Sequence, residues 1–471
     1  MNPALRAIHG ILDKQGDVVE LVRKDLQRGL KNAKAGRSGI NPSQVLRSLV
    51  LMRVKDWDYR ELQERIQDGV SLRVFTGFES SPVPKHDAFN RAFTRLTPET
   101  MRTINECVIG AAVDMGLEDG KELRVDTTVV ETNVHFPTDA TLLWDTARTI
   151  QRLMKKLGEK LPGKRSRIRN RNTSARRRMQ QLQRMTVQQR SQQQIPKYRE
   201  LIRIVDAVIG DGRGLVKIAR KALARTKRPL PATTAASIDQ LGREIEEYCK
   251  LGSQVVDQSR RRVLQGEQVP SEEKVYSIFE PHTALIKRGK AQKPVEFGRK
   301  VFLAESAQGL ITDYRVLDGN PSDGAHVSAS LDRHRGTFQC VPELYASDRG
   351  FFSADNIEVC QKAGVKQICI PHKGGGRSAE QAAAERTPDF KRGQRFRAGI
   401  EGRISVLFRG RGMKRCLAKG PERFEVLVGA AVLTNNLLRI AQMLEDKSKK
   451  QGGKSSKPKP QVRVSAPKAA A

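Results

Sequence analysis

The first 115 residues carry apolar side chains at helical spacing in several short runs. Asn41-Pro42 is typical of a helix start, because an Asn cap precedes Pro at the first helical position. Thr97-Pro98 repeats this signal before the last of the runs, which ends near Met115. The pattern predicts a helical N-terminal domain over residues 1–115. Short helices with polar turns suit a small DNA-binding bundle and equally any other helical bundle, so both interpretations stay open.

Strand-like spacing begins at residues 122–131, where apolar and polar positions alternate before a pair of valines. Residues 297–305 and 310–317 alternate on either side of a turn, which predicts a hairpin. The remaining expected elements are a helix from Val327, a strand ending at Asp348, a helix from Ser353, a strand at residues 367–370, a helix around Glu401 and a last apolar helix at residues 426–443.

The first strand and the hairpin are separated by a long stretch that reads as helical throughout. Residues 141–270 are rich in Gln and Arg and are predicted to form a basic helical insertion. The polar stretch from Gly374 to Gly393 is expected to be a loop. Residues 446–471 consist largely of Lys, Pro, Ser and Ala, a composition that predicts a disordered basic tail.

The order of these elements indicates a fold class. Without the insertion, it is strand, hairpin, helix, strand, helix, strand, helix, which is the order of an RNase H-like domain. We therefore expect an α/β protein with an RNase H-like mixed-sheet catalytic core formed by residues 116–140 and 271–445. The N-terminal helical domain precedes this core, and the long helical insertion follows its first strand.

Charge narrows the class of partner. The chain has 86 Lys and Arg against 52 Asp and Glu, a formal net charge of +34. So large an excess favours a polyanion, because cations that meet phosphates release condensed counterions. No run approaches the roughly 20 apolar residues that a membrane span needs. The six cysteines form no CxxC pair, which argues against a zinc site or disulfide framework and favours a reducing cytoplasm.

One segment concentrates the positive charge. Between Lys164 and Arg190 the chain has ten Lys or Arg and no acid. Such runs usually form a solvated face. Ten cations without a compensating carboxylate are better explained by contact with a phosphate backbone, and we expect Arg176, Arg177 and Arg178 to bind DNA.

Three carboxylates stand where the pattern places functional groups. Asp126 and Asp348 lie near strand ends, and Glu401 lies on a helix whose apolar residues Ile400, Ile404 and Leu407 recur at helical spacing. Taken singly, an Asp at a strand end is usually a turn or cap residue. Together, two Asp and one Glu could converge on a pair of divalent cations, which prefer oxygen ligands.

At these residues the chain resembles a bacterial insertion-sequence transposase of the DDE type. It is most similar to the ISNCY-like group, which is not yet classified further. The resemblance spans about residues 40 to 440. The segments that carry it are Val125-Asp-Thr-Thr-Val-Val-Glu-Thr-Asn133 with Pro137-Thr-Asp139, Ser277-Ile-Phe-Glu-Pro-His-Thr283, Glu296-Phe-Gly-Arg-Lys-Val301, Gly319-Asn-Pro321, Asp348-Arg-Gly-Phe351 and Phe396-Arg-Ala-Gly-Ile-Glu401.

The resemblance implies roles for individual residues. Asp126, Asp348 and Glu401 would be the catalytic, metal-binding triad, with two Mg²⁺ ions for which Mn²⁺ substitutes. Arg397 matches the basic member of the signature around the Glu, and Arg403 is expected to contact DNA from the same helix. The family usually has Lys seven positions after the Glu, where this chain has Phe408. The neighbouring Arg409 is expected to supply that cation.

The implied function is a transposase that cleaves and rejoins the ends of its element by two-metal-ion phosphoryl transfer. Its partner would be double-stranded DNA, at the element's ends and at the target, bound by a homodimer or higher oligomer in the bacterial nucleoid. Two alternatives stay open. Because position 408 departs from the family, the chain could be a catalytically decayed DNA-binding protein, or it could be a nuclease that hydrolyses without strand transfer.

Overall fold

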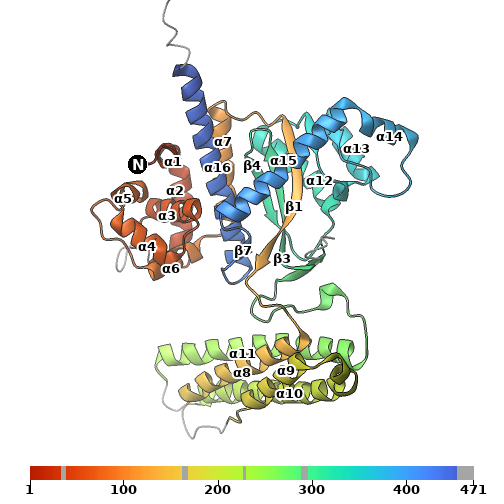
Figure 1. The fold of residues 1–471 in the computed structure, drawn as a ribbon. Coiled ribbons are helices and arrows are strands. Elements are labelled where there is room, and N and C mark those ends of the chain that lie inside the picture. The colour runs from red at the N-terminus through yellow and green to blue at the C-terminus, as the bar shows by residue number, and fades with distance from the viewer. Residues whose placement is uncertain (33–38, 162–167, 226–229, 288–294, 453–471) are drawn as a thin grey trace, which may run out of the picture.

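In a computed structural model of the chain, residues 1–32, 39–161, 168–225, 230–287 and 295–452 are described. Figure 1 shows N-terminal helices on one side, a sheet in the middle and a separate helical bundle below the sheet. The N-terminal helices are α1 (Pro3–Asp13), α2 (Gly16–Gln27), α3 (Pro42–Lys55), α4 (Tyr59–Asp68), α5 (Val70–Thr76), α6 (His86–Arg95) and α7 (Pro98–Asp114).

The two predicted helix starts have the expected caps. At α3, the Asn41 side chain accepts a hydrogen bond from the Ser43 amide at 3.0 Å, and the Gln44 side chain accepts one from the Asn41 amide at 3.2 Å. At α7, the Thr97 hydroxyl accepts a hydrogen bond from the Thr100 amide at 3.1 Å. These bonds satisfy amides that have no partner inside a helix, so each helix begins at its Asn-Pro or Thr-Pro pair.

The N-terminal helices do not close their core alone. The last helix, α16 (Pro421–Gly452), contributes Leu433, Leu437 and Ile440 to the same buried cluster. By length and composition α16 could cross a membrane, but 78% of the apolar window is buried within the protein. The described residues contain no other helix of this kind. Its apolar character is therefore explained by packing between the N-terminal helices and the sheet.

The sheet has seven strands within the described residues and is mixed, as predicted. Its order is β2-β3-β1-β5-β6, with β4 also on β3 and β7 also on β1. The strands are β1 (Glu122–Thr132), β2 (Ala284–Lys287), β3 (Val295–Ser306), β4 (Ile311–Val316), β5 (Leu344–Ala346), β6 (Gln367–Cys369) and β7 (Arg415–Cys416). This arrangement confirms the α/β class with an RNase H-like core.

β1 is paired with β3 along most of one edge, but the short strands on its other edge pair only near its two ends. β1 pairs antiparallel with β3, from Leu123 opposite Ser306 to Glu131 opposite Gly298. On its other edge, β1 pairs in parallel with β5 only at residues 122–124 and with β7 only at residues 131–132. Asp126 lies between these two short pairings. Among the described residues, no strand pairs with this edge of β1 between these two short pairings, and side chains from a crossing helix approach it there.

Helices cover both faces of the sheet. Because successive strand residues point to opposite faces, Val301 and Leu303 pack with α15 (Pro388–Gly410) and α16, whereas Phe302 and Ala304 pack with α12 (Val327–Phe338) and α13 (Ala354–Ala363). Figure 1 shows α15 crossing β1. Short 3-10 turns lie between these elements at η2 (Ser271–Glu273), η3 (Asp323–His326) and η4 (Arg349–Phe351).

The insertion forms a helical bundle with its own core. It consists of α8 (Asp139–Lys160), α9 (Asn172–Arg184), α10 (Val187–Arg225), α11 (Ala232–Ser259) and a final π-helical turn, η1 (Arg260–Leu264). Leu143, Ile150, Leu201 and Ile245 are among its fully buried residues. The helices pack closely, since a Cβ at Gly252 would lie 2.4 Å from the Thr146 side chain.

Two sequence predictions require correction. The stretch from Gly374 to Gly393 is not wholly a loop, because it contains α14 (Ala379–Arg386) and the start of α15. Ser378 caps α14 in a reciprocal capping box, and Thr387 followed by Pro388 caps α15. Residues 446–452 continue α16 instead of starting a tail. The rest of the predicted tail lies outside the described residues.

Candidate active site

Asp126 lies on β1 and faces α15. Its residue exposure is 8%, so the carboxylate is largely removed from water. One oxygen, Oδ1, accepts a hydrogen bond from the Thr127 amide at 2.7 Å. The other, Oδ2, lies 3.1 Å from Nη2 of Arg397 on α15. The backbone amide fixes the carboxylate so that its second oxygen points toward the helix.

Asp348 follows β5 and is held in a similar way. Its Oδ1 accepts a hydrogen bond from the Gly350 amide at 2.8 Å and caps η4. Its Oδ2 lies 3.8 Å from Nη2 of Arg397. The side chain is 36% exposed, so this carboxylate is more accessible than that of Asp126. An Asp at a strand end is often only a cap residue, and Asp348 is one through Oδ1. Its Oδ2 does not cap the turn and faces Arg397.

Glu401 completes the group from α15 itself. Its Oε1 lies 3.2 Å from Nη1 of Arg397, one helical turn earlier, and its side chain is 69% exposed. All three predicted acids therefore contact one guanidinium. Among the described residues, no three His, Cys, Asp or Glu side chains are close enough to hold a single ion as they stand. The acids surround an arginine in this arrangement.

The donor set nevertheless suits hard divalent cations. Each of the three acids directs one carboxylate oxygen toward the same small volume, and two of these carboxylates are oriented by backbone amides. Mg²⁺ prefers oxygen ligands and keeps open water positions. Glu401 is exposed and its side chain has several rotatable bonds, so it can adjust to an ion.

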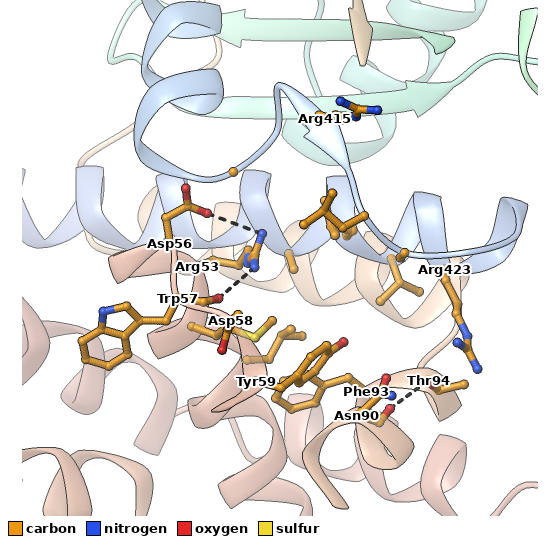
Figure 2. Close-up of a pocket in the computed structure, with 18 of the residues that line it drawn as sticks. Arg53, Asp56, Trp57, Asp58, Tyr59, Asn90, Phe93, Thr94, Arg415 and Arg423 are labelled. Carbon is orange, nitrogen blue, oxygen red and sulfur yellow. Dashed lines mark hydrogen bonds and ion pairs between the residues drawn. The ribbon is translucent and has the colours of Figure 1, made fainter. Parts of the chain in front are cut away.

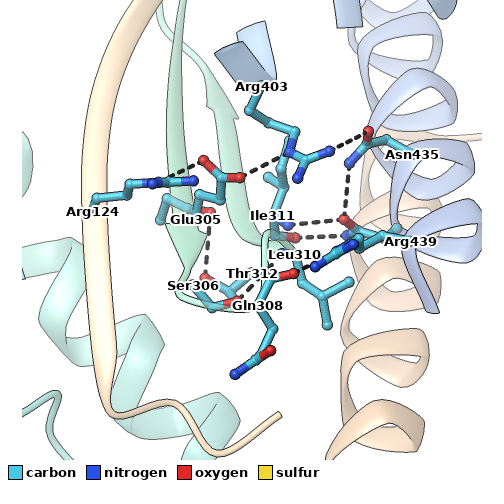
Figure 3. A network of polar contacts seen from close by, with 12 residues as sticks. Arg124, Glu305, Ser306, Gln308, Leu310, Ile311, Thr312, Arg403, Asn435 and Arg439 are labelled. Atoms are coloured by element: carbon cyan, nitrogen blue, oxygen red, sulfur yellow. Dashed lines mark hydrogen bonds and ion pairs between the residues drawn. The ribbon is translucent and has the colours of Figure 1, made fainter. Parts of the chain in front are cut away.

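A buried ion-pair network fixes α15 against the sheet (Figure 3). The Glu305 side chain on β3 is fully buried, and its two oxygens accept hydrogen bonds from Arg124 Nε and Arg403 Nε, each at 2.8 Å. Arg124 also donates to the Phe396 carbonyl at 2.6 Å, next to Arg397. Arg403 reaches Asn435 of α16 at 3.4 Å. The network ties β1, β3, α15 and α16 together.

This network changes the interpretation of Arg403. The sequence predicted a DNA contact, but the side chain is only 20% exposed and pairs with a buried carboxylate. Arg397 and Arg403 are six residues apart, so they leave α15 on different sides. Arg397 faces the acids, and Arg403 faces the interior. Arg403 is therefore a structural residue in this arrangement.

Position 408 faces the junction between the N-terminal helices and the core. Phe408 is half-buried and lines a pocket of about 610 Å³. Figure 2 shows Trp57, Tyr59 and Phe93, which line the same pocket. Phe408 also packs against the cluster formed by α15, α16 and the sheet. An aromatic side chain suits its contacts with that apolar cluster, whereas the pocket lining is mixed and also contains Arg53, Asp56 and Arg423. Arg409, the next residue, is exposed in the last turn of α15.

The predicted DNA-binding arginines of the insertion differ from one another. Arg176 and Arg177 on α9 are exposed, and no ion pair involves them within the described part of the chain. Arg178 is half-buried and pairs with Glu200 of α10. Its charge is therefore partly compensated, contrary to the impression given by the acid-free segment. Residues 164–167 of that segment lie outside the described residues.

Sequence reasoning missed a second charged pair at the site. Lys300 Nζ lies 2.7 Å from Asp323 Oδ1, which also accepts a hydrogen bond from the Thr127 hydroxyl at 2.8 Å. A Cβ at Gly350 would lie 2.9 Å from Asp323 Oδ2 and 3.0 Å from Asp348 Oδ1, so a fourth carboxylate lies close to the triad. Asp323 stands in a turn cluster whose sequence indicated only a turn.

The mixed sheet, covered by helices on both faces, is consistent with the RNase H-like class. The family model for a transposase domain, DUF772, matches residues 2–95, and the model for the transposase DDE domain matches residues 272–437. The chain belongs to the insertion-sequence transposases of the DDE type. No curated protein and no solved structure matches it significantly. The two family models do not identify the ISNCY-like group, which stays a prediction.

Proposed function

We propose that this transposase cleaves the ends of its insertion sequence and joins them to target DNA by two-metal-ion phosphoryl transfer, with Asp126, Asp348 and Glu401 as the triad. The observation that carries the proposal is that one oxygen from each of these acids contacts the same guanidinium. Side chains from a strand, from the turn after a second strand and from a helix, far apart in sequence, have converged on one position.

In this reaction the protein's carboxylates would hold the metal ions and orient them. Asp126 and Asp348 would hold the ions, each kept in place by a backbone amide, and Glu401 would complete the set. Two Mg²⁺ ions, or Mn²⁺ in their place, supply activation of the attacking water or 3′-hydroxyl and stabilisation of the leaving oxygen. Lys300 and the Thr127 hydroxyl would hold Asp323, and with it the turn η3, against the sheet beside the acids.

The DNA partner would be met by cations on several elements. Arg397 lies beside the acids, and together with the exposed Arg409 in the last turn of α15 it would contact the strand being cut. Arg176 and Arg177 would contact the backbone further along the duplex, whereas Arg178, which pairs with Glu200, would contribute less. The N-terminal helices, residues 1–115, are the candidate for recognition of the element's ends. We place this activity in the bacterial nucleoid, with a dimer or higher oligomer pairing two ends.

The test uses a plasmid that carries the coding region with its natural flanking DNA. Incubated with the full chain and Mg²⁺, it is expected to be cut at two positions that bracket the coding region, and sequencing would map them. Cuts scattered over the plasmid would favour the nuclease without strand transfer. Binding without cuts in Mg²⁺ or Mn²⁺ would favour the decayed protein and contradict the proposal.

The exposed arginines of α9 are expected to contribute directly to DNA affinity. Replacing Arg176 and Arg177 together by Gln should flatten the plot of log affinity against log salt by about 0.9 for each phosphate that the protein no longer neutralises. The matched control is Arg178→Gln, since Arg178 already pairs with Glu200 and should change the slope less. Equal slopes for the double variant and the unaltered protein would mean that this surface is only solvated.

A further inference from the structure

Arg397 uses the oxygens that a metal ion would need. In Asp126 and Asp348, Oδ1 is engaged by a backbone amide, and Oδ2 is the oxygen that contacts Arg397. In Glu401, Oε1 makes the contact. The guanidinium therefore occupies the volume onto which these three oxygens converge, and a divalent cation could not share that volume without strong repulsion between like charges.

The position of Arg397 also allows its guanidinium to move away from the acids. Its Nε is buried without a hydrogen-bond partner within the described residues, so the side chain is only partly satisfied where it lies. Glu401, its neighbour on the same helical face, is 69% exposed, and Ala398 beside it is exposed as well. The guanidinium can therefore swing toward solvent along the open side of α15. A phosphate beside the acids would offer it a planar, bidentate partner.

We propose that Arg397 is an exchangeable counter-cation that holds the three acids together before metal binds and moves to a DNA phosphate when metal enters. This inference rests on the proposed function, because it assigns the metal to the same acids. In the metal-free protein, Arg397 offsets the repulsion among three carboxylates that would otherwise separate. Arg397 is a positioning residue in this account, since it acts on metal binding through the acids.

Such an exchange couples the binding of metal to the binding of DNA. DNA that draws Arg397 away frees the carboxylate oxygens, so DNA should raise the affinity for metal, and by reciprocity metal should raise the affinity for DNA. The chain would then take up its metal mainly when a phosphate backbone lies in the site. Metal-dependent chemistry would be suppressed away from DNA.

The experiment measures Mn²⁺ affinity of the full chain by electron paramagnetic resonance, with and without a short DNA duplex of random sequence. Such a duplex supplies phosphates but no element end to cut. For the unaltered protein, the duplex is expected to tighten Mn²⁺ binding by about tenfold, within the usual range of coupling between sites. Arg397→Ala should bind Mn²⁺ about tenfold tighter without DNA and gain little more from the duplex.

Arg395→Ala is the matched control, because it removes the same charge from an exposed position two residues earlier on α15. It should behave as the unaltered protein does. Arg397→Gln repeats the test with a longer polar side chain, in case the Ala variant folds poorly. If both Arg397 variants bind Mn²⁺ no tighter than the Arg395 control, the exchange is overturned while the metal site stands. If even the unaltered protein binds no Mn²⁺ with DNA present, the proposed function falls as well.

Discussion

Asp348→Asn is expected to lower Mg²⁺-dependent cleavage of the element's ends by roughly a thousandfold or more, because metal ions in such sites supply several kcal/mol of transition-state stabilisation. This substitution keeps the hydrogen bond that caps η4. Asp348 Oδ1 caps η4 by accepting from the Gly350 amide, and the amide oxygen of Asn can accept the same bond. Only the charged oxygen that faces Arg397 changes character.

A measurement of DNA binding separates a loss of catalysis from a loss of structure. DNA binding measured without metal should survive in Asp348→Asn, because the cations that meet the backbone are untouched. The control is Asp355→Asn, the same chemical change at an exposed position at the start of α13, which should leave cleavage unaltered. Cleavage by Asp348→Asn at the control's rate would remove Asp348 from the active site.

Glu305→Gln is expected to lower the free energy of unfolding by about 3–5 kcal/mol, the usual result of breaking a buried ion pair by removing one partner. Glu305 is fully buried between Arg124 and Arg403, and Gln would leave both guanidinium groups without their carboxylate. Because Arg124 also holds the Phe396 carbonyl, the loss should loosen α15 next to Arg397 and Glu401.

Urea unfolding monitored by circular dichroism measures this change. The control is Glu343→Gln, since Glu343 pairs with Lys366 at 3.2 Å on the surface, where both side chains are more than half exposed. Exposed pairs contribute about 0–1 kcal/mol. If the two variants unfold at the same urea concentration, the buried network does not stabilise the fold as proposed.

Much of the fold followed from spacing along the chain. Alternation predicted β1 and the β3–β4 hairpin, and helical spacing with Asn-Pro and Thr-Pro starts predicted α3 and α7. The short strands β2 and β7 were missed, because so few residues make no pattern of their own. β2 pairs with the next strand, β3, and β7 pairs with the distant β1. The start of α15 was hidden by a polar, glycine-containing sequence whose capping residues are the only local signal.

The candidate site was predictable as a set of residues but not as a set of contacts. Strand ends and helical spacing marked Asp126, Asp348 and Glu401 as candidates, and the resemblance to DDE transposases, with the strongly basic chain, made them the predicted triad. The resemblance set Arg397 apart, and its spacing of four residues from Glu401 is local, but the sequence could not show that Arg403 faces Glu305, because that carboxylate lies on a distant segment. The proximity of Asp323 to Asp348 depends in the same way on a turn that folds against η4.

Strand transfer is the most direct test of the central claim. Precut DNA carrying the element's end with a free 3′-hydroxyl is mixed with the full chain, Mg²⁺ and a supercoiled target plasmid, and joined products are scored on a gel. We predict end-to-target joints with the unaltered protein and none with Asp348→Asn or without the metal. Target plasmid that is nicked but never joined, or left intact in Mg²⁺ and Mn²⁺ alike, would contradict the account.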